Sequence, residues 1–161
     1  AMATYAGQNY GAGLPVRVWQ GVKSATIIMM VYAILMNLLL WTQAEQFALL
    51  FVDAHEVEIL QKTALFIHVS VSFYPMLGML CILRYTIQGV GYTSLAMLSG
   101  VSEMFARIAV SVIAVPLWGY TAVCFGDSMA WVCAVLFLAP AFHYVYRRMT
   151  RLSPTSSAQT L

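Results

Sequence analysis

The sequence predicts an all-α polytopic membrane protein, a helical bundle with four full transmembrane helices and the end of an earlier one. Of its 161 residues, 61% are hydrophobic and 9% are charged, whereas a soluble domain has about 25% charged residues. The mean hydropathy is +0.80, and the apolar residues form runs of bilayer-crossing length. The lipid bilayer is therefore an expected partner. A net charge of +2 gives no reason to expect nucleic acid.

Each expected span is long enough to cross a bilayer, because a helix rises 1.5 Å per residue. Three of the four contain a core without any Asp, Glu, Lys or Arg, and the third is interrupted by Glu103 and Arg107. We expect the spans at about 18–44, 60–86, 93–117 and 122–147.

The segments between the spans have the composition of connections. We interpret AMATYA at the start of the chain as the last turns of an earlier span, too short to be a helix of its own, and GQNYGAGLP (7–15) as a turn. Residues 44–58 carry four acids and predict an amphipathic, interfacial connection. Further turns are expected at 87–94 and 115–121, and a disordered cytoplasmic tail at 149–161.

The basic residues near the span ends predict the orientation. Lys62 lies near one side of the membrane, and six basic residues fall on the other: Arg17, Lys23, Arg84, Arg147, Arg148 and Arg151. Cytoplasmic loops carry the excess of Lys and Arg. We therefore expect a multi-pass protein of the cell (inner or plasma) membrane with both ends in the cytoplasm.

Glu103 and Arg107 are the two charges inside the third span. Their spacing of four places them on one helix face, with the acid N-terminal to the base as in favourable helix pairs. A charge at the bilayer centre costs about 2.5–3.5 kcal/mol on insertion scales. We expect both side chains to face a bundle interior or a water-filled cavity. The sequence leaves open whether they fix helix packing or act directly in transport or gating.

Five further residues are candidates for transport or gating. His68 is either a proton relay or a hydrogen-bonding group between helices. Pro75, flanked by Tyr74, predicts a kink that acts as a hinge or as a static bend. Asn37, with Tyr32 on the same span, is placed either to bond across helices or to contact a polar substrate.

The remaining polar and sulfur-containing residues give no sign of an enzyme. Asp127 is expected near the start of the fourth span, where an acid caps the helix. The three cysteines show no metal-ligand or disulfide spacing. The sequence contains no nucleophile–base set and no HExxH, so we expect no catalytic residue, no metal site and no cofactor.

Three stretches resemble multidrug and toxic compound extrusion (MATE) transporters, most closely the bacterial branch that includes the DNA-damage-inducible type. QNYGAGLPVRVWQGV (8–22) resembles the loop after the second helix of a lobe. LRYTIQGVGYTSLAMLSGVSEMFAR (83–107) resembles the stretch with an Arg, a Gln-Gly-x-Gly turn and an E-x-x-x-R on the next helix. GYTAVCFGDSMAWV (119–132) resembles the start of the last helix. The loop residues that carry this resemblance are Gln8, Asn9, Gly11, Gly13, Gln88, Gly89 and Gly91.

The resemblance implies a twelve-helix protein of two six-helix lobes, of which residues 1–148 would be the C-terminal part of the second lobe. It also implies a secondary active antiporter that exports drugs or organic cations in exchange for Na⁺ or H⁺, with Glu103 and Arg107 at the E-x-x-x-R positions. Residues 63–83 contain no acid. They therefore lack the carboxylate with which some members bind the coupling ion, and both Na⁺ and H⁺ stay open as that ion.

Three alternatives remain open. A lipid-linked oligosaccharide flippase of the same superfamily would need a more cationic cavity. A small four-span protein that acts as a homodimer would begin at Met2. A truncated remnant would have no transport activity, because the N-terminal lobe, against which the second lobe would move, would be missing.

Overall fold

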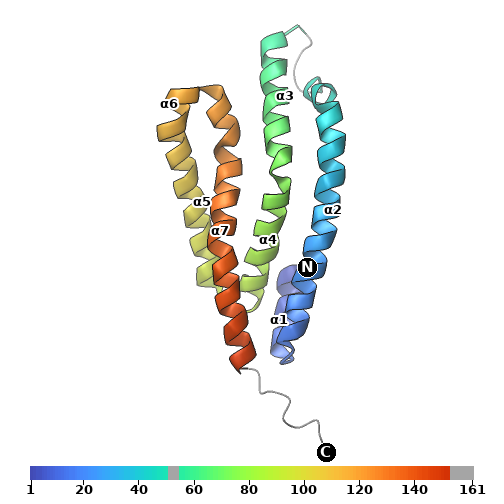
Figure 1. Cartoon of the computed structure of the whole chain (residues 1–161), viewed down its shortest axis with the longest axis vertical. Helices are drawn as coiled ribbons and strands as arrows, with labels where there is room; N and C mark the ends of the chain where they lie inside the picture. The colour runs from blue at the N-terminus through green and yellow to red at the C-terminus, as the bar shows by residue number, and fades with distance from the viewer. Residues whose placement is uncertain (51–54, 153–161) are drawn as a thin grey trace, which may run out of the picture.

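The computed structural model describes residues 1–50 and 55–152, and within them all regular structure is helical. Helix α2 (Pro15–Ala48), the pair α3 (Val57–Ser72) and α4 (Tyr74–Gly89), and α7 (Tyr120–Leu152) lie side by side as long rods (Figure 1). The remaining rod is α5 (Thr93–Ala109), continued by a π-helical segment (Val110–Ala114) and by α6 (Val115–Trp118). This arrangement is the expected all-α bundle.

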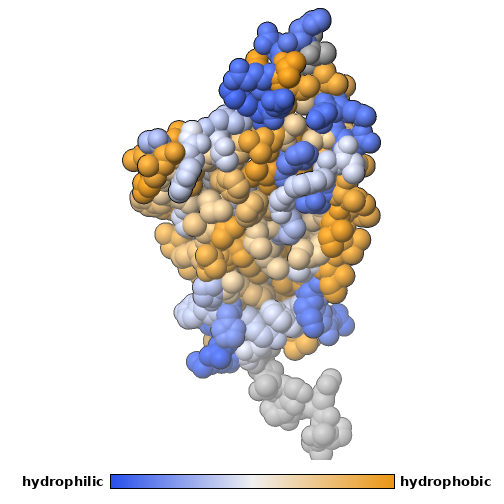
Figure 2. Space-filling model, turned by 45° about the horizontal axis from the view of Figure 1, so that its top comes forward, coloured by the Kyte–Doolittle hydropathy of each residue, from blue (hydrophilic) through white to orange (hydrophobic). Residues whose placement is uncertain are grey.

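Three helical rods are each long and apolar enough to span a membrane: α2, α7 and the continuous Thr93–Trp118. The pair α3–α4 qualifies as a fourth span, bent by 47°. Figure 2 shows an apolar belt between polar surfaces at the two ends of the molecule. The surfaces of these rods carry large apolar side chains that are more than 60% exposed, such as Ile28, Leu38 and Val112. Such a surface suits acyl chains, and the chain is a multi-pass membrane protein.

The bend in the second span lies beside Pro75. Proline has no amide hydrogen and its ring clashes with the preceding turn, so a helix breaks or kinks at that point. Here α3 ends at Ser72, Phe73 links the two helices, and Pro75 occupies the first turn of α4. A proline also explains the π-helical segment, because Pro116 has no N–H to donate to the Val112 carbonyl one turn earlier.

The interpretation of residues 1–15 is wrong in one respect. Residues Met2–Gly11 form a helix of their own, α1, and the turn is confined to residues 12–14. Turn residues such as Gly and Asn weaken a helix by a few tenths to about 1 kcal/mol each, which packing can offset. Ala6 is fully buried, and α1 packs against α2 and α4 at the lower end of the bundle (Figure 1).

Several other boundaries differ from those expected. Helix α2 begins at Pro15, a favoured first residue of a helix, and reaches Ala48. The expected turn at 115–121 is reduced to Gly119, whose φ of 58° is accessible to glycine at no steric cost. Helix α7 continues to Leu152, past the expected start of the tail at 149. Residues 51–54 of the expected interfacial connection, and 153–161 of the expected disordered tail, lie outside the described residues.

The main hydrophobic core joins α1, α2, α4 and α7. Its members recur at helical spacing, such as Leu80, Leu83 and Ile87 on α4 and Leu138, Phe142 and Val145 on α7. Helices α5 and α7 form the other half of the bundle, with α4 packed against both. Three helices therefore meet where the charges of the third span lie.

Candidate functional site: an intramembrane charge network

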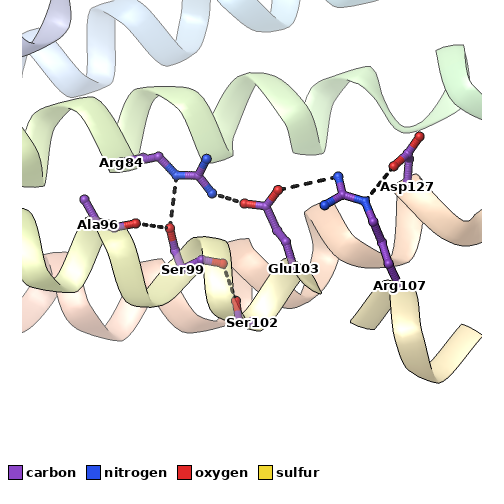
Figure 3. Close-up of polar contacts among 7 residues, drawn as sticks. All are labelled: Arg84, Ala96, Ser99, Ser102, Glu103, Arg107 and Asp127. Carbon is purple, nitrogen blue, oxygen red and sulfur yellow. Dashed lines mark hydrogen bonds and ion pairs between the residues drawn. The ribbon is translucent and has the colours of Figure 1, made fainter. Parts of the chain in front are cut away.

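Glu103 is buried among α4, α5 and α7, with only 8% of its surface exposed. It lies ten residues into the span that begins at Thr93, about 15 Å along the helix. Its two carboxylate oxygens contact different arginines (Figure 3): Oε1 is paired with Arg84 of α4, and Oε2 lies 3.7 Å from Nη2 of Arg107. Glu103 is therefore a single anion shared by two cations from two helices.

Arg84 is held in place by a second contact. Its Nε donates a hydrogen bond to Ser99 Oγ at 3.0 Å, and Ser99 Oγ donates to the Ala96 carbonyl at 2.7 Å. The Arg84 side chain is 26% exposed and reaches along α5 from Ser99 to Glu103. The fork of guanidinium donors fits this task, because it bonds a carboxylate and a hydroxyl at once.

Arg107 joins Glu103 to a second acid. Its Nε donates to Oδ1 of Asp127 on α7 at 2.8 Å, closer than its contact with Glu103. The four charges alternate in sign as Arg84, Glu103, Arg107 and Asp127, and they tie α4, α5 and α7 together (Figure 3). We call these four residues the charge network.

The two ends of the charge network differ in exposure. The Glu103 side chain is 11% exposed, whereas those of Arg107 and Asp127 are 45% and 49% exposed. Asp127 lies seven residues after Tyr120, about 10 Å from that end of α7. A charged pair at this depth faces protein or water rather than acyl chains. The surface around Arg107 and Asp127 is therefore unsuited to contact with lipid.

Arg107 can separate from Asp127 without becoming an unpaired charge. A cation that reaches Asp127 competes with Arg107, and the displaced guanidinium still has Glu103 as a neighbour. Because the ion pair of Arg107 and Asp127 is one of the contacts between α5 and α7, a cation at Asp127 would remove one contact between these helices.

Two members of the charge network differ from their sequence-based interpretation. Asp127 does not cap a helix, because α7 begins seven residues earlier, after Gly119. Arg84 was expected at the membrane boundary, but it points into the bundle. A signal for Arg84 was present: it and Ser99 lie seven and eight residues on either side of the turn at Gly91, so antiparallel helices place them opposite each other. Without Arg84, five basic residues remain on the expected cytoplasmic side.

Asn37 and Pro75 meet through one backbone carbonyl. Because Pro75 has no N–H, the Val71 carbonyl four residues before it loses its usual helical donor. Asn37 Nδ2 of α2 donates to that oxygen at 3.1 Å. The bend in the second span is therefore stabilised by a hydrogen bond from the neighbouring span.

Replacing Asn37 by Leu should destabilise the protein by about 1 kcal/mol, because the Val71 carbonyl loses its donor from α2 inside the membrane and keeps only a backbone N–H at the end of α3. The free energy of unfolding in detergent measures this loss. In a Pro75→Ala background, where residue 75 has an N–H again, the same change should cost less. Equal costs in the two backgrounds would show that Asn37 acts independently of the proline.

The other candidates lie away from the charge network. His68 Nε2 is 3.3 Å from the Trp41 carbonyl, and the two rings stack at 4.6 Å, which joins α3 to α2. The ring of Tyr74 lies 6.4 Å from that of Trp131 on α7. Tyr32 is 54% exposed on the outer face of α2. The structure thus brings Glu103 and Arg107 together with Arg84 and Asp127. His68, Tyr74 and Tyr32 lie outside the charge network.

The loop residues serve turns and close helix packing. In the first turn, the Gln8 and Asn9 carbonyls accept from Ala12 and Leu14. Gly11 ends α1 with open space around it, and Gly13 has a φ of 71°.

The second loop also contains a turn hydrogen bond and a glycine with a positive φ. In the turn after α4, the Gln88 carbonyl accepts from Gly91, whose φ is 101°. Gly89 is different, because α1 crosses α4 there: a Cβ on Gly89 would lie 2.2 Å from the Ala3 carbonyl oxygen.

One comparison with known proteins identifies a family for this chain. A protein-family model described as MatE matches residues 1–113, more than two thirds of the 161 residues. The match includes α1 to α5 and three members of the charge network. No curated protein and no solved structure shows a significant match.

Proposed function

The chain belongs to the MatE family, and from this premise we propose that it works in a secondary active antiporter that exports organic cations or drugs in exchange for Na⁺ or H⁺. The chain is a multi-pass membrane protein, which we place in the cell (inner or plasma) membrane with both ends in the cytoplasm. We assign it no catalytic residue and no cofactor beyond the coupling ion.

The half-exposed pair of Arg107 and Asp127 carries this proposal. Isolated charges are costly at membrane depth, so the surface around the pair requires a polar neighbour. In a two-lobe transporter that neighbour is the water-filled cavity between the lobes. We therefore infer that α5 and α7 line the cavity with this face, and that a second helical bundle, the N-terminal lobe, covers it.

The geometry of the charge network supports a proposal for the coupling step. Asp127 is the exposed carboxylate, held by Arg107 at 2.8 Å. When H⁺ or Na⁺ binds Asp127, Arg107 keeps only its ion pair with Glu103, and the contact between α5 and α7 weakens. When the ion leaves, the ion pair between Arg107 and Asp127 forms again. Glu103, which is buried and paired with Arg84, remains the partner of Arg107 in this step.

A lipid-linked oligosaccharide flippase is less well supported. Such a protein must bind a pyrophosphate with free cationic groups in its cavity. Arg84 and Arg107 are each paired with a carboxylate, so the charge network as a whole is neutral. Competition of transport by lipid-linked precursors, rather than by organic cations, would favour the flippase.

Replacing Asp127 by Asn should lower gradient-driven transport of ethidium about tenfold or more, because Asn cannot exchange a proton or Na⁺ for Arg107. The measurement is uptake into everted vesicles from cells that lack their own pumps, with the chain co-expressed with the remainder of a MATE transporter, which is its N-terminal lobe and the first part of its second lobe. Glu58→Gln is the control: Glu58 also pairs with a base, Lys62, but its side chain is 80% exposed at the end of α3.

Two outcomes would count against the proposal. One is an Asp127→Asn variant that transports ethidium as fast as the unaltered chain. The other is substantial gradient-dependent transport by the 161-residue chain alone, because the face around Asp127 would then need no covering bundle. Imposing a pH gradient and a Na⁺ gradient in turn identifies the coupling ion.

A further inference from the structure

A groove between α2, α4 and α7 lies apart from the charge network. It encloses about 750 Å³, within the range of ligand-binding pockets. Its walls come from helical faces of α2 and α7, and Met79 and Leu83 of α4 contribute to the lining. Nearly all of the lining is apolar, so the groove suits a hydrocarbon chain.

One end of the groove carries three aromatic rings. Trp19 of α2 stacks on Phe142 of α7 at 5.8 Å and lies 5.5 Å from the ring of Tyr146. Trp19 is four residues from the start of α2, and Tyr146 is six residues from the end of α7. Trp and Tyr are enriched at this depth, where the headgroups of a bilayer meet its acyl region.

Two basic side chains line the groove at one level. Lys23 lies eight residues after the start of α2, and His143 lies nine residues before the end of α7, so both are about 12–14 Å from the same end of the bundle. Within the described residues, neither side chain has a hydrogen bond or an ion pair. Lys23 offers a cation and His143 an N–H donor without a protein acceptor.

The charge at this end of the molecule is of one sign. The sequence has no Asp or Glu in residues 1–44 or in 128–161, whereas Arg17, Arg147, Arg148 and Arg151 all fall there. An anion at Lys23 therefore meets no nearby acid from α2 or from this half of α7. The nearest part of α4, Met79 to Leu83, is also free of acids.

We propose that this groove binds an anionic phospholipid of the cytoplasmic leaflet. The phosphate lies at Lys23 and His143 beside the aromatic rings, and one acyl chain runs from there along the groove towards Val135. Complementary charge selects the headgroup, since a basic pocket between transmembrane helices at the cytoplasmic side suits acidic lipids. The site is separate from the charge network and does not depend on the coupling step proposed above.

Quenching of tryptophan fluorescence by brominated lipid tests this site. The full chain is placed in phosphatidylcholine vesicles that contain brominated phosphatidylglycerol or, at equal mole fraction, brominated phosphatidylcholine. The Trp19 signal is the difference between the unaltered chain and Trp19→Phe. We expect phosphatidylglycerol to quench Trp19 with an apparent affinity several-fold higher. Trp118, 68% exposed on α6, should respond equally to both lipids.

Two variants locate the headgroup and the chain. Lys23→Gln should weaken the preference for phosphatidylglycerol about fivefold, whereas Arg17→Gln, outside the groove, should change it much less. Ala139→Phe fills the groove and should abolish quenching of Trp19, and Leu136→Phe, on the outer face of α7, should not. Equal quenching by the two lipids, or an unchanged preference in Lys23→Gln, would overturn the proposal. So would a Trp19 that neither lipid reaches, because a second protein segment would then fill the groove.

Discussion

A Glu103→Gln variant should lose about 3–5 kcal/mol of its free energy of unfolding. Glu103 is the anion that two arginines share, and its side chain is 11% exposed. Removing one partner of a buried ion pair costs this much, because the other charge stays buried without compensation. Arg84 would keep only the Ser99 hydroxyl, while Arg107 would keep Asp127. Titration with SDS in mixed micelles measures the loss.

A double-variant cycle separates the charge from the packing. Arg84→Met combined with Glu103→Leu removes both charges of one pair and leaves Arg107 with Asp127. The combined loss should therefore be smaller than the sum of the two single losses. Glu58→Gln, which alters an exposed pair, should change stability little. Additive losses in the cycle would mean that Arg84 and Glu103 do not depend on each other.

Gly89→Ala should displace α1 from α4 and destabilise the protein by about 1–3 kcal/mol, the usual cost of overpacking. The added methyl group would lie 2.2 Å from the Ala3 carbonyl oxygen, and a backbone atom cannot rotate away as a flexible side chain can. The free energy of unfolding gives the size of the effect. Thiol labelling of an Ala6→Cys variant reports the displacement, because residue 6 is fully buried while α1 stays in place.

Gly11→Ala is the matched control for this change. It also adds a methyl group to a helical glycine near a helix end, but nothing lies within 4 Å of it. We expect it to leave the labelling of residue 6 unchanged. If Gly89→Ala is as stable as Gly11→Ala and equally protected from labelling, then α1 is not held by close contact with α4.

The sequence was sufficient to predict the bundle because its signals are local. A run of apolar residues specifies a span by itself, and Pro75 marks the bend by chemistry that acts on its own helix. Spacing also placed Glu103 and Arg107 on one face. Helix α1 was missed for the same reason: Gly, Gln and Asn favour a turn locally, and the contacts that stabilise the helix come from residues about 80 positions away in α4.

The partners of the charge network required knowledge of register. Asp127 meets Arg107 only because α7 begins directly after Gly119, a boundary that composition does not define. Arg84 meets Glu103 only because it extends along α5 into the bundle instead of towards the membrane surface. Each contact depends on the relative register of two packed helices, and that register is set by packing over their whole length.

The single-residue turn at Gly119 also bears on biogenesis. Arg107 and Asp127 lie on opposite sides of that turn, 12 and 8 residues away, so their ion pair forms within one helical hairpin. A hairpin that leaves the translocon as a unit brings Arg107 and Asp127 into lipid as an ion pair, whereas α7 alone would carry Asp127 without this partner. The tight reversal therefore lowers the barrier to insertion of the hairpin that carries Arg107 and Asp127.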